Sequence, residues 1–270
     1  MLSQLSELWR YRELVANLVM RDLKVRYKNS VLGIAWSWLN PLLMMAVFTV
    51  VFTVINRAPS DIQHYPVFIL AGILPWNFFS ASVVGATASI VGNGYLIKKV
   101  YFPREVLPLT AVLSSMVNFL IALPVFFGMA LVFGVRLTPW VLFVPIVLLV
   151  QVIFSVGIGL MLATLNVYYR DTQIIMEVLM LAWFFVTPIF WDARVMPETK
   201  LLLGIVWPVR RLVYILNPMA SIVASYRDTM YYGVQPALDF FVRSTLTAVV
   251  ILVLGYLVFH RFSQSFAEEL

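Results

Sequence analysis

The sequence predicts an all-α membrane protein: six transmembrane helices, an N-terminal amphipathic interface helix, and re-entrant outer helices between spans five and six. Hydrophobic residues make up 62% of the 270 positions and charged residues only 12%, whereas soluble domains usually have about a quarter charged residues. Six apolar stretches approach the ~20 residues that a helix needs to cross a bilayer, and none alternates like a membrane-barrel strand. The predicted spans are Ile34–Ile55, Val67–Ile90, Val106–Phe133, Trp140–Leu165, Ile174–Trp191 and Phe240–Phe259.

The chain is expected to form one membrane domain, because no segment between the spans is long enough to bury a soluble core. We assign residues 1–30 to a cytoplasmic interface helix, residues 31–262 to the six-span domain and residues 263–270 to a short cytoplasmic tail. Met1–Tyr27 has scattered charges and no apolar core ahead of a cleavage site, so it does not resemble a signal peptide. We expect membrane insertion to depend on the first span.

The charges predict that both termini are cytoplasmic. Six basic residues precede the first span, and Val91–Glu105 holds three more, which the positive-inside rule places in the cytoplasm. Asp192–Asp239 falls outside despite five basic residues, as long loops can. Within it, Leu201–Leu216 is apolar but too short to span, and we interpret it as a re-entrant or interfacial pair of helices. The alternative is a seventh span, which would place the C-terminus outside.

Several function classes are disfavoured. No Asp, Glu, Lys or His lies near the centre of a predicted span, which argues against ion-coupled carriers and proton pumps. The carboxylates are isolated, cysteine is absent and there are two histidines, so we expect no catalytic residue and no metal site. No phosphate-loop motif occurs, so no nucleotide cofactor is expected on this chain. The net charge of +6 is explained by the positive-inside rule, and no nucleic-acid partner is predicted.

The N-terminal segment is a candidate lipid-docking surface. Apolar residues in Ser3–Tyr27 recur every three or four positions, which predicts a basic amphipathic helix in the plane of the interface. It is either a simple anchor or a docking surface for a partner or for anionic lipid. Four basic residues could attract the pyrophosphate of a lipid carrier at the inner headgroups, although a plain positive-inside signal has the same pattern. These residues are Arg21, Lys24, Arg26 and Lys28.

The inside loop is a candidate partner-binding surface. Tyr95–Phe102 is predicted to form a short helix that Pro103 ends. Tyr101 and Phe102 are expected to face the cytoplasm beside Lys98 and Lys99, and aromatic side chains beside cations are typical of protein interfaces. A solvated turn is the alternative. The candidate contact residues are Tyr95, Lys98, Lys99, Tyr101, Phe102, Arg104 and Glu105.

Aromatic residues are numerous, with 20 Phe, 12 Tyr and 8 Trp. Most are expected to serve in packing or lipid contact, and a minority could line a conduit in which the C–H faces of sugar rings slide over aromatic rings. Polar residues within spans, such as Asn77, Asn118 and Gln151, are expected to form interhelical hydrogen bonds instead. The candidate conduit residues are Phe48, Phe52, Trp183, Phe184, Phe185, Phe190 and Trp191.

Four motifs together resemble the ABC-2 type permeases that export polysaccharides, especially those for O-antigen and teichoic acid, with capsule permeases behind them. They extend from the N-terminal helix to the segment before the last span, so the resemblance covers nearly the whole chain. The motifs are Arg21–Pro41 (RDLKVRYKNSVLGIAWSWLNP), Leu96–Pro108 (LIKKVYFPREVLP), Asn166–Asp171 (NVYYRD), and Leu216–Met219 (LNPM) followed by Tyr226-Arg227.

The resemblance implies a homodimer of six-span subunits in a bacterial inner membrane, bound to two copies of a separate ATPase subunit that holds ATP and Mg. It implies that the N-terminal helix and the Gly94–Arg104 loop contact this ATPase, and that Arg194–Leu216 forms the outer re-entrant helices. The implied substrate is a lipid-linked glycan, usually on undecaprenyl pyrophosphate. An exporter of drugs or small lipids remains an alternative, as does a membrane scaffold without transport.

Overall fold

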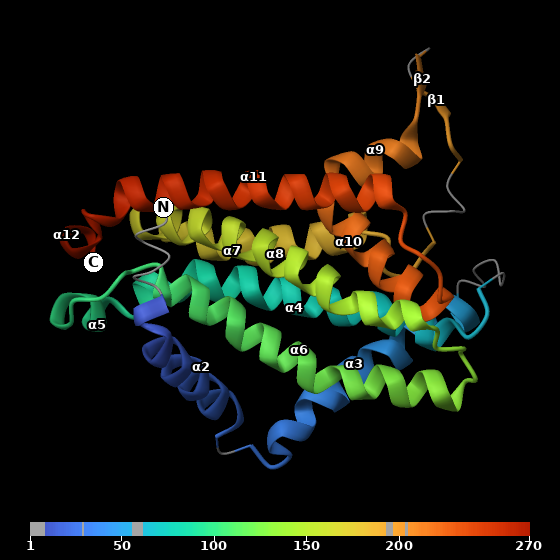
Figure 1. Ribbon diagram of the computed structural model, residues 1–270, viewed down its shortest axis with the longest axis horizontal. Coiled ribbons are helices and arrows are strands. Elements are labelled where there is room, and N and C mark those ends of the chain that lie inside the picture. The colour runs from blue at the N-terminus through green and yellow to red at the C-terminus, as the bar shows by residue number, and fades with distance from the viewer. Residues whose placement is uncertain (1–8, 29, 56–61, 193–196, 203–204) are drawn as a thin grey trace.

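The computed structural model describes residues 9–28, 30–55, 62–192, 197–202 and 205–270. These residues form an elongated bundle of lengthwise helices with one small hairpin at an end (Figure 1). The elements are α2 (Arg12–Tyr27), η1 (Gly33–Ala35), α3 (Trp36–Thr49), η2 (Val50–Ile55), α4 (Tyr65–Gly92), α5 (Gly94–Lys99), α6 (Val106–Val132), η3 (Pro139–Phe143), α7 (Val144–Tyr168), α8 (Asp171–Val186), β1 (Lys200–Leu202), β2 (Ile205–Trp207), α9 (Val209–Leu216), α10 (Pro218–Arg227), η5 (Asp228–Tyr232), α11 (Leu238–Ser263) and α12 (Phe266–Glu269).

Five of the six predicted spans are confirmed as helices that are long and apolar enough to cross a membrane. Within the described residues they are Gly33–Ile55, Tyr65–Gly92, Val106–Val132, Pro139–Tyr168 and Leu238–Ser263. Their bounds lie within a few residues of the predicted ones. The reason is that the predicted spans and the observed helices are both defined by an uninterrupted apolar length.

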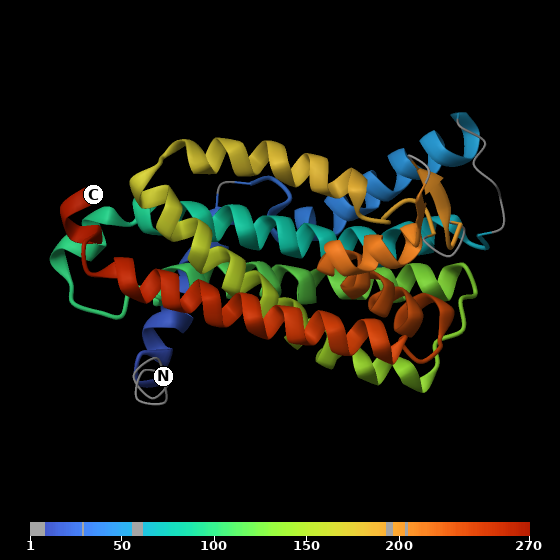
Figure 2. The same ribbon diagram turned by 90° about the horizontal axis from the view of Figure 1, so that it is seen from above.

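The fifth predicted span differs from the structure at its C-terminal end. The sequence predicted one helix over Ile174–Trp191, but α8 ends at Val186 and has 16 residues, about 24 Å at ~1.5 Å per residue. The reason is Pro188, because the residue before a proline is disfavoured in the helical region, and Thr187 is extended with ψ of 134°. Figure 2 shows that α8 still runs lengthwise beside α4.

The segment after α8 corrects a second prediction. A pair of helices was expected over Leu201–Leu216, but its first arm is an antiparallel hairpin in which Lys200 pairs with Trp207. Pro208 separates this hairpin from α9, the only helical part of the expected pair within the described residues. The longest helix described between α8 and α11 is α10, with 10 residues, so the alternative of a seventh span has no described helix to form it.

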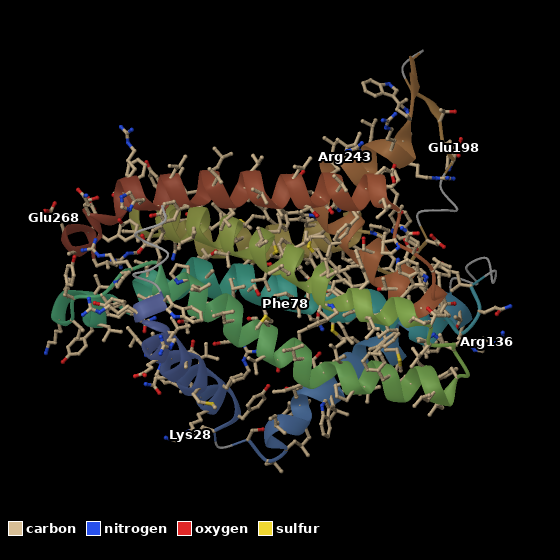
Figure 3. The ribbon with its side chains drawn as sticks, in the orientation of Figure 1. Lys28, Phe78, Arg136, Glu198, Arg243 and Glu268 are labelled. Carbon is tan, nitrogen blue, oxygen red and sulfur yellow. The ribbon has the colours of Figure 1, made fainter. Side chains whose placement is uncertain are left out.

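The core runs along α4, which packs against α3, α6, α7, α8 and α10. A second, smaller apolar cluster joins α2, α5 and α12 to the nearby ends of α6, α7 and α11. These three short elements lie at one end of the bundle, and α9 and the hairpin lie at the other (Figure 1). Arg136 and Glu198 lie toward the hairpin end and Glu268 lies at the α12 end (Figure 3).

Candidate conduit and coupling surfaces

The structure brings the two halves of the candidate conduit together. Phe48 and Phe52 come from α3 and η2, while Phe184 and Phe190 come from α8 and the chain just after it. The rings of Phe52 and Phe190 stack with centroids 4.9 Å apart, and Phe48 lies 5.6 Å from Phe184 and 6.1 Å from Phe190. Residues more than a hundred positions apart therefore form one aromatic cluster, at spacings where ring pairs attract each other.

The other three candidate conduit residues have different surroundings. Trp183 is half-buried and donates a hydrogen bond from Nε1 to Oδ1 of Asn217 over 2.8 Å. Phe185 is 55% exposed, and its ring lies 5.7 Å from that of Phe190. Trp191 contacts no other aromatic ring in the described part of the chain. Phe185 thus extends the aromatic cluster to the surface of the bundle, whereas Trp183 fastens α8 to the start of α10.

Four of the candidate partner-contact residues project from the end of the bundle. Tyr95, Lys98 and Lys99 are exposed on α5, and Tyr101, just after it, is 91% exposed. The Lys99 ammonium lies 4.2 Å from the centre of the Tyr95 ring and donates to its hydroxyl over 2.5 Å. A cation is attracted to the face of an aromatic ring, so the Lys99 and Tyr95 side chains hold each other in place. The end of the bundle around α5 therefore presents a surface of basic and aromatic side chains.

Phe102 corrects the prediction that it faces outward. It is only 6% exposed and packs in the second apolar cluster with Val15, Leu18 and Ile97. The predicted helix ends early, at Lys99, and the chain is extended at Val100. Because neighbouring side chains of an extended segment point to opposite sides, Tyr101 points out and Phe102 points in.

Arg104 and Glu105 also turn inward. The guanidinium of Arg104 lies 5.9 Å from the centre of the Phe266 ring. The Glu105 carboxylate, 16% exposed, lies 3.9 Å from Nδ1 of His260. Both residues therefore connect the loop to the C-terminal end of α11 and to α12 rather than extending the exposed surface.

The four basic docking candidates separate into two pairs. Arg21 and Arg26 border cavities between α2, α4 and α6, whereas Lys24 and Lys28 line neither cavity. Lys28 lies at the turn after α2 and points away from the bundle (Figure 3). Of the four candidates, only the two arginines therefore line a cavity.

With this geometry established, comparisons with known proteins identify the family. Residues 13–231 match the family model described as ABC-2 type transporter. The chain belongs to the ABC-2 type transporter family. It is 34% identical over 270 residues to the O-antigen export system permease protein RfbA of Myxococcus xanthus, with both chains fully covered. A protein of the same name from Klebsiella pneumoniae is 33% identical over 261 residues, covering 96% of this chain and 95% of that one. The polysialic acid transport protein KpsM of Escherichia coli is 23% identical over 226 residues, 81% of each chain.

Family membership confirms the predicted resemblance. It also fits the expectation of a membrane transport subunit rather than an enzyme. Two features of this ABC-2 chain were nevertheless missed by reasoning from the sequence.

The first missed feature is the buried position of Arg227, which the sequence analysis treated only as a loop charge and as part of a family motif. It is 4% exposed at the end of α10, and its guanidinium donates to the carbonyl oxygens of Pro188 and Ile189 and, over 3.4 Å, to that of Trp191. The guanidinium carbon lies 3.7 Å from the centre of the Phe68 ring. Burial lowers the pKa of Arg227 to about 10, so it stays charged at neutral pH. The signal available in the sequence was Arg227 following the uncharged segment 212–226.

The second missed feature is a polar latch made by Tyr27, Ser37 and Asn118. The hydroxyls of Tyr27 and Ser37 both donate to Oδ1 of Asn118, over 2.5 and 2.7 Å, and the two hydroxyls also contact each other. The latch joins the end of α2, the start of α3 and the middle of α6. An interhelical hydrogen bond was expected for Asn118, but nothing in the sequence indicated its partners.

Proposed function

We propose that this chain is the permease subunit of an ATP-driven exporter that moves a lipid-linked, O-antigen-like polysaccharide across a bacterial inner membrane. The observation that carries the proposal is the match, at 33–34% identity over nearly the full chain, to proteins named as O-antigen export permeases. The absence of a phosphate-loop motif from the sequence supports a separate subunit that binds ATP and Mg. The carrier is undecaprenyl pyrophosphate.

In the proposed assembly, two copies of the chain form a homodimer with two ATPase subunits. Both termini are cytoplasmic, and α8 with the chain just after it is the fifth of six crossings, which completes the set. The exposed basic and aromatic residues around α5 lie at the same end as α2 and α12, which supports placing this end at the cytoplasmic face. In this arrangement α2 is the amphipathic interface helix, and α9 and α10 form the re-entrant pair on the outer side.

Movement of the ATPase subunits is transmitted through α5. Tyr95, Lys98, Lys99 and Tyr101 make the contact, because they are exposed at the end of the bundle. Ile97 on the opposite side of α5 packs in the second apolar cluster, which includes residues of α6, α7 and α11. Since a packed cluster transmits displacement rather than absorbing it, a push on α5 shifts the spans.

The conduit surface is the aromatic cluster that Phe185 extends to the outside of the bundle. Rings without hydrogen-bonding groups offer a glycan repeated weak contacts, which allow sliding without tight binding. In the homodimer this surface of each copy faces the passage. Trp183 and Phe184 hold this surface in place from the interior of the bundle, because Phe184 is buried and Trp183 is hydrogen-bonded to Asn217.

The neighbouring residues Tyr101 and Phe102 give a matched test of the coupling surface. Tyr101→Ala is expected to leave the unfolding temperature unchanged, because the ring is exposed. It is expected to reduce the stimulation of the ATPase subunit by this chain, because the ring is proposed to contact that subunit. Phe102→Ala is expected to destabilise the protein by about 3 kcal/mol, because it opens a cavity in the second apolar cluster. Thermal unfolding in detergent and ATPase assays on the reconstituted complex measure both effects. Equal losses of stability in the two variants would contradict the assignment.

The proposed function is tested by co-expressing the chain with an ABC ATPase encoded beside it and reconstituting the complex in vesicles. We expect the two proteins to co-purify and ATP to drive uptake of an undecaprenyl-linked O-antigen glycan. If the complex transported teichoic acid, capsule polysaccharide, a drug or a small lipid instead, the proposed substrate class would be wrong and that compound's class would take its place. Failure to bind any ATPase would favour a membrane scaffold. Uphill transport by the chain alone would overturn the proposal.

A further inference from the structure

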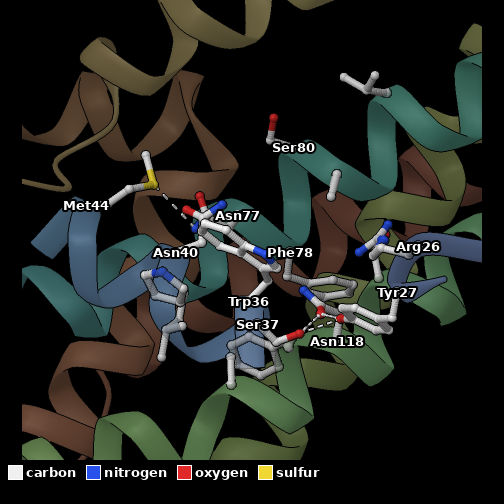
Figure 4. A pocket seen from close by; sticks show the side chains of 17 residues that line it. Arg26, Tyr27, Trp36, Ser37, Asn40, Met44, Asn77, Phe78, Ser80 and Asn118 are labelled. Carbon is white, nitrogen blue, oxygen red and sulfur yellow. Dashed lines mark hydrogen bonds between the residues drawn. The ribbon is translucent and has the colours of Figure 1, made fainter. Parts of the chain in front are cut away.

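Two adjoining cavities lie beneath the N-terminal helix, and we call them together the α2 groove. One, of about 770 Å³, lies between the end of α2, α3, α4 and α6. The other, of about 600 Å³, lies between α2, α4 and α6. Both are lined by Arg26, Ala81 and Ser115, so the cavities meet there. Figure 4 shows Arg26 and the Tyr27–Ser37–Asn118 latch at the wall of the larger cavity.

The smaller cavity has a net positive rim. It is lined by Arg21, Asp22 and Arg26 from one side of α2. The Arg21 guanidinium is paired with the Asp22 carboxylate at 3.0 Å and donates to Oδ1 of Asn93 over 3.3 Å. Arg26 forms no ion pair with any residue in the described part of the chain. One guanidinium charge is therefore uncompensated at the point where the two cavities meet.

The smaller cavity is also lined by two hydroxyls without partners among the described residues. Thr110 and Ser114 lie one turn apart on α6, line the smaller cavity and are 2% and 3% exposed. Neither hydroxyl has a hydrogen-bond partner among the described residues. Helical Ser and Thr commonly donate to the carbonyl four residues back, as Ser115 does to Ala111 over 3.0 Å. Because an unpaired buried hydroxyl is unfavourable, each group would be stabilised by a ligand oxygen that reached it.

We propose that the α2 groove binds the phosphate-bearing headgroup of a membrane lipid, with Arg26 and the Thr110 and Ser114 hydroxyls donating to its oxygens. Charge-assisted contacts of this kind are the usual way in which proteins hold phosphate. The groove lies against two membrane-spanning helices, α4 and α6. The larger cavity is also lined by the aromatic side chains of Trp36, Phe78 and Phe119, which suit a lipid chain rather than a free anion. The inference rests on the proposed function and locates the pyrophosphate of the carrier in this groove.

The test measures binding of undecaprenyl pyrophosphate without a glycan to the purified full-length chain in lipid nanodiscs, with no ATPase present. Arg26→Gln is expected to weaken binding about tenfold, because a charge-assisted contact is lost. The double variant Thr110→Val, Ser114→Ala is expected to weaken it at least about threefold while keeping or raising the unfolding temperature, because both hydroxyls lack protein partners. Arg12→Gln, an equal charge change on the exposed part of the same helix, is the control and should bind as the wild type does.

Three results would overturn the inference. Lys24→Gln could weaken binding as much as Arg26→Gln, which would indicate diffuse attraction to the membrane surface. Inorganic pyrophosphate could bind as tightly as the lipid, which would indicate a free-anion site. The double variant could bind normally, which would remove α6 from the site. If any of these results were found and the protein still exported glycan with ATP, the proposed function would stand and only the groove inference would fail. If the groove bound the lipid as expected but the protein exported no glycan, the groove inference would stand and the proposed function would fail.

Discussion

Replacing Gly255 with alanine is expected to separate α7 from α11 and to destabilise the protein by about 3 kcal/mol. Gly255 on α11 faces Gly157 on α7, and a Cβ at position 255 would overlap the carbonyl of Gly157. From the other side, a Cβ at Gly157 would lie 2.6 Å from the backbone nitrogen of Leu252. Backbone atoms cannot rotate out of the way as a side chain can, so the two helices must move apart. Close packing of small residues is what holds helices together inside a bilayer.

Gly128→Ala is the matched control, because a Cβ at Gly128, near the C-terminal end of α6, meets nothing within 4 Å. This variant is expected to unfold within about 0.5 kcal/mol of the wild type. Thermal unfolding of both variants in the same detergent, followed by size-exclusion chromatography, measures the difference. If Gly255→Ala and Gly128→Ala unfold alike, the contact between α7 and α11 does not determine stability.

The spans could be predicted because a bilayer imposes one requirement, apolar length, that is visible along the sequence. The end of α8 could also have been predicted, since Pro188 lies inside the predicted stretch and restricts Thr187. The hairpin Lys200–Trp207 was harder, because short apolar runs are ambiguous between helix and strand. Whether Phe102 or Tyr101 points inward depends on the residue at which α5 ends, and boundaries of elements are the least predictable feature of a sequence.

The candidate surfaces were predictable in composition but not in arrangement. The aromatic residues near Phe48 and Phe190 were identified, but their stacking depends on how α3 packs beside α8. Lys24 and Lys28 cannot be distinguished from Arg26 by charge alone, because only the packing of α2 on α6 selects the residues that line a cavity. The free hydroxyls of Thr110 and Ser114 are a property of tertiary structure, since neither residue type nor spacing shows which partner is missing.

Arg227→Met is expected to destabilise the end of the bundle that carries the hairpin by about 3 kcal/mol and to abolish export. Methionine can fill part of the space beside Phe68, but it leaves the carbonyls of Pro188 and Ile189 without their donor. Each buried carbonyl that loses its partner costs about 1–3 kcal/mol. Those carbonyls belong to the segment after α8 that carries Phe190, so the aromatic cluster loses its support. Arg227→Lys is expected to restore little, because an ammonium lacks the planar fork that serves two acceptors and stacks on a ring.

The control is Arg211→Met, an equal loss of charge at an exposed position of α9, which should unfold and export as the wild type does. Because the chain has no cysteine, Phe190→Cys introduces a single reporter thiol in the supported segment. We expect this thiol to react faster with a membrane-impermeant reagent when Arg227→Met is added, and at an unchanged rate when Arg211→Met is added. Equal reactivity in the two backgrounds would show that Arg227 does not position the segment, and a loss of export would then need another cause.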